Sequence, residues 1–93
     1  YNLQTRLGKF AQIASALGQE TDGLCEYDAA CLAVEAVRQM NDDLGIPDGL
    51  KETGVKASGI NQLAKTAMQS GNIAVNPRKT TLADMQALFR TAM

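Results

Sequence analysis

Histidine is missing from this 93-residue sequence. Its absence removes the usual general base, so no serine in the chain can be activated in the way that serine-type hydrolases require. Tryptophan is missing as well, and aromatic residues make up only 4%. A chain of this size buries only about 60–65% of the surface that it exposes when unfolded. We therefore expect one small domain at most, with a thin margin of stability.

Cysteine is nearly as scarce, since Cys25 and Cys31 are the only two. Two cysteines are too few for a disulfide framework. If both lie on one helix, the rise of six residues separates their Cα atoms by about 9 Å, beyond the roughly 7 Å that a disulfide allows. We expect free thiols that pack as small hydrophobic side chains in a reducing compartment.

The sequence also lacks an excess of charge of either sign. It has 9 Lys and Arg residues and 10 Asp and Glu residues, for a net charge of −1. A nucleic-acid partner is not expected, since phosphate binding needs a concentrated basic face. No apolar run approaches the roughly 20 residues that span a bilayer, and the N-terminus lacks the pattern of a signal peptide. The sequence predicts a soluble, cytoplasmic protein with no membrane partner.

Helical periodicity, punctuated by glycine, is what the sequence does contain. Apolar residues recur at spacings of three and four, and no segment has the alternation of a strand. Gly18, Gly45 and Gly71 are expected to end three helices, and Gly54 to close a short turn capped by Asp48. The residues expected to face inward on the four helices are Leu3, Leu7, Phe10, Ile13, Ala14 and Leu17; Ala30, Ala33, Val34, Val37, Met40, Asn41 and Leu44; Ile60, Leu63, Ala64, Ala67 and Met68; and Leu82, Met85, Leu88, Phe89 and Ala92.

Two of these helices carry a start signal. Ser58 is the predicted N-cap of the third helix. Thr81, with Asp84 three residues later, has the spacing of a capping box at the start of the last one. Four or five short helices without strands predict an all-α bundle. Because helices this short are marginal alone in water, their apolar faces must pack on one another or on something outside this sequence.

The acidic residues do not form a convincing catalytic pair. Asp42 and Asp43 are adjacent on the second helix and therefore point in different directions, and Glu20 and Asp22 lie in a polar turn. The acidic residues do not reproduce the spacing of a calcium-binding loop either. We expect both pairs to be solvated, and we expect no catalysis by this chain alone.

Several blocks of the sequence occur in a distinctive order. They are Phe10–Gly18, Gly45–Leu50, the turn Asn76, Pro77 and Arg78, and Met85–Met93. In this order they resemble the C-terminal part of the iron-containing (group III) alcohol dehydrogenases, and the resemblance covers nearly the whole chain. It implies a dehydroquinate-synthase-like enzyme, with an N-terminal α/β domain that binds NAD(P) and a C-terminal helical domain that holds Fe²⁺, or Zn²⁺ in its place.

The resemblance assigns residues 1–93 to the C-terminal segment of the helical, metal-binding domain. The nucleotide-binding domain and the family's metal ligands, one aspartate and three histidines, would lie upstream. No catalytic, cofactor-binding or metal-binding residue is therefore expected in this chain. Asn72, four residues before the turn, corresponds to the edge of the substrate pocket in some members, or else is a plain turn residue. Arg78 is either an anion clamp or, as we favour, a structural residue that fixes the turn.

Two hypotheses follow from these observations. In the first, the chain is a structural scaffold within a metal-dependent, NAD(P)-linked, homo-oligomeric alcohol dehydrogenase that acts on short alcohols, diols or aldehydes. In the second, it is an independent helical binding or oligomerisation module whose last helix docks into a partner's groove. Tyr1 in place of an initiating methionine favours the first.

Overall fold

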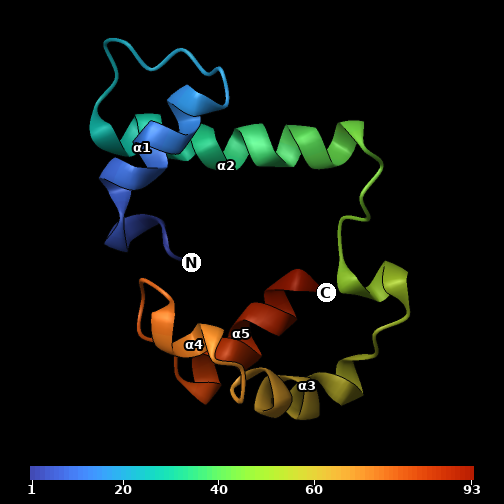
Figure 1. Ribbon diagram of the computed structural model, residues 1–93. Coiled ribbons are helices and arrows are strands. Elements are labelled where there is room, and N and C mark those ends of the chain that lie inside the picture. The colour runs from blue at the N-terminus through green and yellow to red at the C-terminus, as the bar shows by residue number, and fades with distance from the viewer. The chain divides into compact units, whose positions relative to one another are not determined.

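The computed structural model describes all 93 residues as five α-helices and three short 3-10 helices, with no strand (Figure 1). The all-α fold expected from the sequence is confirmed. The chain divides into two compact units, Tyr1–Ile46 and Pro47–Met93. None of the helices combines the length and the apolar character needed to cross a membrane.

The first unit consists of the 3-10 helix η1 (Leu3–Thr5) and the helices α1 (Leu7–Ala16) and α2 (Glu26–Asp43). The first helix starts later than the apolar pattern suggests, because Arg6 has φ −144° and interrupts it. Gly18 and Gly45 end the two helices as predicted, with φ values of 85° and 70°. After Gly45, the amide of Ile46 donates to the carbonyl of Asn41 at 2.9 Å, which is the bond of a Schellman motif.

Alanines form the contact between α1 and α2, which pack against each other (Figure 1). Ala14 on α1 and Ala29, Ala30 and Ala33 on α2 are buried. The expected inward face of α2 is only partly covered, since Val37, Met40 and Leu44 are exposed, Leu44 to 69%. Helix α1 has 10 residues and α2 has 18. At about 1.5 Å per residue the shorter helix cannot cover the longer one.

The second unit contains η2 (Leu50–Thr53), η3 (Ala57–Gly59), α3 (Ile60–Ala67), α4 (Asn72–Val75) and α5 (Leu82–Ala92). Two predicted caps are wrong here. Ser58 lies inside η3, and α3 follows Gly59 without any side-chain cap. Asp48 does not cap η2, whose N-cap is Gly49. In both cases the local residue type suited a cap, but the backbone enters the helix at the following glycine.

Glycines account for two further outcomes in this unit. Gly54 closes η2 with φ 91°, as predicted. Gly71 was expected to stop the third helix, but α3 already ends at Ala67, and Gly71, with φ −60°, is the N-cap of α4. Helix α4 was not predicted, because four residues are too few to show a helical period.

The start of α5 has the expected capping box. The Thr81 hydroxyl accepts from the Asp84 amide at 3.2 Å, and the Asp84 carboxylate accepts from the Thr81 amide at 2.9 Å. Helix α5 packs against α3, where Ile60 and Ala64 are buried. No residue of α5 is itself buried, and Leu82, expected on its covered face, is exposed. Both units thus carry apolar faces that their own helices leave uncovered.

Candidate functional site

Asn72, the predicted edge of a substrate pocket, is the first residue of α4. It is exposed, and its main-chain amide donates to the Ser70 hydroxyl oxygen at 3.3 Å. This bond helps the chain turn from the end of α3 into α4. The three cavities described for the two units are lined by other residues, so the pocket-edge role of Asn72 stays a prediction.

The turn between α4 and α5 is built around the half-buried side chain of Asn76. Its amide group donates to the carbonyl oxygen of Arg78 at 2.7 Å, and the Thr80 hydroxyl donates to the same oxygen at 3.1 Å. Pro77 between them has no N–H that would need a partner. The turn therefore delivers the chain to the capping box of α5 in one defined path, and these bonds use the main chain of Arg78.

The acidic pairs singled out from the sequence are not assembled into a catalytic arrangement. Asp43 accepts from the side-chain amide of Gln39 at 2.9 Å on the exposed surface of α2, beside the exposed Asp42. The Glu20 carboxylate accepts from the Asp22 amide at 3.3 Å within the turn between α1 and α2. The carboxylates of Asp43 and Glu20 thus stabilise the helix surface and the turn in which they lie.

Both cysteines are free and lie at the start of α2. The Cys25 sulfur accepts from the Asp28 amide at 3.4 Å as the N-cap of that helix. The neighbouring Cys31 side chain raises the pKa of the Tyr27 hydroxyl, and partial desolvation and the charge of Asp28 add to the effect. Cys25 is exposed, which differs from the buried packing expected for it, because an N-cap lies outside the packed part of its helix.

No group of three or more histidine, cysteine, aspartate or glutamate side chains lies close enough to hold a metal ion. The largest of the three cavities described, of about 700 Å³, lies in the second unit and is lined partly by Lys51, Lys56 and Arg90. The sequence does not predict these three cations as a group. They are far apart along the chain and show no motif, so only the packing of α5 near η2 and η3 reveals them.

Comparison with known proteins identifies the family. The model of the Fe-containing alcohol dehydrogenase family, C-terminal part, matches residues 1–93. This chain belongs to that family. Among its relatives, 1,3-propanediol dehydrogenase of Citrobacter freundii is 41% identical over 92 residues, which cover 99% of this chain and 24% of the relative. Lactaldehyde reductase of Escherichia coli (strain K12) is 37% identical over 92 residues, with the same coverage of both chains.

Two solved structures have the same fold over the region that this chain matches. The crystal structure of a 1,3-propanediol oxidoreductase matches this chain with a TM-score of 0.96 at 39% identity. The matched region covers 100% of this chain and 24% of the oxidoreductase chain. An alcohol dehydrogenase from Oenococcus oeni matches with a TM-score of 0.92 at 39% identity. The chain therefore spans 24% of the length of these relatives.

The residues of this segment do not fit the metal that gives the family its name. Iron and zinc sites in enzymes are built from imidazole, carboxylate or thiolate groups that converge on one point. This chain has no histidine, and its acidic and cysteine side chains form no such cluster. Nor does the sequence contain a glycine-rich phosphate-binding loop between a strand and a helix, since the structure has no strand.

Proposed function

We propose that residues 1–93 are the C-terminal segment of the helical domain of a metal-dependent, NAD(P)-linked alcohol dehydrogenase, and that the segment serves as a structural scaffold. One observation carries this proposal: the family match extends over the whole chain, yet the chain corresponds to only 24% of its relatives. The groups that would hold the metal, Fe²⁺ or Zn²⁺, and the dinucleotide would then belong to the rest of the protein.

The names of the relatives support the class of substrate. They include a 1,3-propanediol dehydrogenase, a lactaldehyde reductase and an NAD-dependent methanol dehydrogenase of Bacillus methanolicus. All three names refer to small alcohols, diols or aldehydes, so we propose a substrate of that size. We further propose that the enzyme is a cytoplasmic homo-oligomer.

Within this enzyme, we propose that Asn72 lies at the edge of the substrate pocket. Asn76, Pro77 and Arg78 would act structurally, because the bonds of the Asn76 side chain set the path from α4 into α5. A rigid turn just after α4 would hold Asn72 in place. This arrangement gives the segment a positioning role without any catalytic group of its own.

The first experiment is to capture the protein from its source cells with an antibody against residues 81–93 and to measure its intact mass. We expect a polypeptide several times heavier than the 9.9 kDa of this chain. That protein should oxidise short alcohols with NAD or NADP, lose the activity to a chelator, and regain it with Fe²⁺ or Zn²⁺. A mass near 9.9 kDa would refute the proposal and favour an independent helical module. A heavy protein without metal-dependent oxidation would refute it too.

The role of Asn72 is tested by replacing it with alanine in the intact enzyme. If Asn72 borders the pocket, the ratio of kcat/KM between a short and a longer alcohol should change by about tenfold, the scale of small steric changes in a pocket. Asn61→Ala, at an exposed position on α3, is the matched control and should leave the ratio unchanged. Equal ratios in both variants would mean that Asn72 is only a turn residue.

A further inference from the structure

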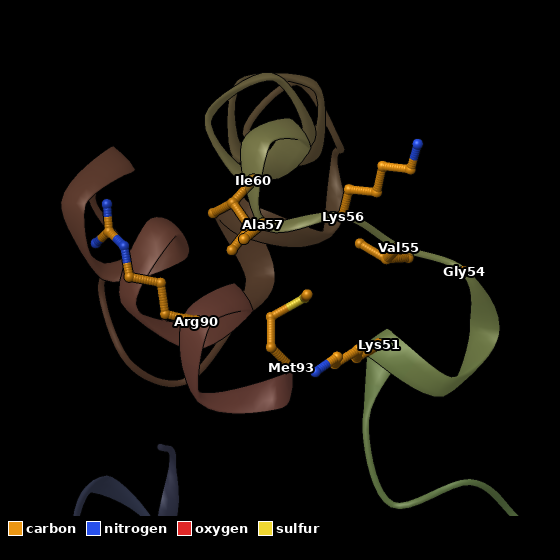
Figure 2. A pocket seen from close by; sticks show the side chains of 8 residues that line it. All are labelled: Lys51, Gly54, Val55, Lys56, Ala57, Ile60, Arg90 and Met93. Atoms are coloured by element: carbon orange, nitrogen blue, oxygen red, sulfur yellow. The ribbon is translucent and has the colours of Figure 1, made fainter.

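The 700 Å³ cavity of the second unit combines an apolar floor with a positively charged rim. Val55, Ala57, Ile60 and Met93 contribute the apolar lining (Figure 2). The volume is about 700 Å³. Cavities of this size bind ligands or receive side chains from another segment. The floor of the cavity continues into the apolar contact between α3 and α5. An apolar group that enters the cavity would therefore extend the core of this unit.

Lys51, Lys56 and Arg90 surround this floor, and no aspartate or glutamate lines the cavity. None of the three is held in an ion pair, in contrast to Arg38, which pairs with Glu35 at 2.9 Å. The imbalance extends to the whole unit, because residues 47–93 contain six lysines and arginines but only three acidic residues. Anything that covers the cavity must therefore bring negative charge, since a cation buried without a partner is costly.

The directions of the side chains argue against a single small anion as the occupant. In Figure 2 Lys56 and Arg90 extend away from the apolar floor on opposite sides. One phosphate or carboxylate cannot meet both of them at hydrogen-bond distance. A polypeptide segment can, because it places several side chains along its length and inserts an apolar one between them.

We propose that this cavity is the docking surface for an acidic segment of the same polypeptide that lies outside residues 1–93. An apolar side chain of that segment would contact Ile60 and Met93, and its aspartates or glutamates would face Lys51, Lys56 and Arg90. The inference rests on the proposed function. Residues 1–93 match only 24% of the length of the relatives. The remaining length of such a protein could supply the covering segment.

Zero-length cross-linking of the intact enzyme tests this directly. A carbodiimide joins a lysine amine to a carboxylate only where the two groups touch, and peptide mass spectrometry then identifies both residues. We expect Lys51 or Lys56 to be joined to an aspartate or glutamate outside residues 1–93. Lys65, exposed on α3 and not part of the cavity, is the matched control and should stay unlinked. Enzyme mixed from ¹⁴N- and ¹⁵N-labelled chains distinguishes a bridge within one chain from a bridge between two.

Each other outcome overturns the inference. A bridge to a carboxylate within residues 1–93 would mean that the segment covers its own cavity, and a mixed-isotope bridge would mean that a second copy does. Unlinked lysines that are acetylated as readily as Lys65 would mean that nothing covers it. The intact mass separates these results from a failure of the proposed function: a protein near 9.9 kDa would refute both, whereas a heavy, active enzyme with freely reactive lysines would refute only the docking surface.

Charge removal gives a second readout that does not depend on cross-linking. In the intact enzyme, Lys56→Gln or Arg90→Gln should raise the rate of amide hydrogen exchange in α3 and α5 by about tenfold, because each loses a charge pair with the covering segment. Lys65→Gln should leave the rates unchanged. Both glutamine variants keep the length of the chain and its apolar core, so exchange rates equal to the control would overturn the inference.

Discussion

Gly49 precedes η2 at a point where the end of α5 lies against the backbone. A Cβ atom added there would lie 2.8 Å from the carbonyl carbon of Met93 and 3.3 Å from the carbonyl oxygen of Ala92, and closer still to the carbonyl oxygen of Met93. Ordinary contacts of a Cβ atom begin at 3.4 Å. The backbones must therefore separate by about half an ångström or more. They cannot do so by rotating a side chain, because the obstructing atoms belong to the main chain.

Gly49→Ala should therefore destabilise the second unit by about 2–4 kcal/mol. Overpacking of this kind costs about 1–3 kcal/mol. The bond from the Lys51 amide to the Met93 carbonyl, at 3.4 Å, would be lost as well, which adds about 1 kcal/mol. Gly59→Ala is the matched control, because its φ is −87° and no atom lies within 4 Å of the added Cβ. That change should be neutral or slightly stabilising.

The assay is urea unfolding of the two variants side by side, together with amide exchange at Lys51. We expect a lower unfolding midpoint and faster exchange for Gly49→Ala only. If Gly49→Ala were as stable as Gly59→Ala, the end of α5 would not lie against Gly49. Met93 would then not form part of the cavity wall.

Three further predictions concern single side chains. Thr81→Ala removes the cap of α5 and should lower the free energy of unfolding by about 1 kcal/mol in urea titrations; an unchanged midpoint would show that the cap adds nothing. Ile60→Ala should cost about 2–4 kcal/mol because Ile60 is only 6% exposed, and Leu63→Ala less than half as much because Leu63 is 38% exposed; equal costs would contradict the packing of α3. Cys31→Ala should lower the raised pKa of Tyr27, followed by tyrosinate absorbance in a Tyr1→Phe background. The interaction with Cys31 stabilises the folded state below pH about 10, and this contribution is lost as the pH rises through the raised pKa; a titration unchanged by the substitution would contradict the assignment of the shift to Cys31.

The uncovered apolar faces link the fold to the proposed function. Val37, Met40 and Leu44 on α2 and Leu82 on α5 are exposed, although their spacing is that of buried residues. No large side chain in the chain is fully buried. A free-standing module would be expected to fill its core with such side chains. A segment of a larger enzyme need not, because the rest of the protein can cover these faces.

The sequence by itself determined the features that depend on near neighbours in the chain. Gly18, Gly45 and Gly54 were recognised as stops because a left-handed residue costs glycine little, and all three have positive φ. The capping box of Thr81 and Asp84 was recognised because both partners lie within one turn. The order of such signals along the chain also carried the resemblance that the family match confirmed.

Only the tertiary structure decided which apolar faces are covered and which charges gather around a cavity. Periodicity shows which side of a helix is apolar, but it does not show whether another helix reaches that side. Lys51, Lys56 and Arg90 met at one cavity because α5 packs against α3 and ends beside η2. The prediction that Ser58 caps α3 was wrong because the chain enters the 3-10 helix η3 at Ala57, before Ser58 is reached. Local residue preferences amount to about 1 kcal/mol at each position, so the packing of the whole unit can override them.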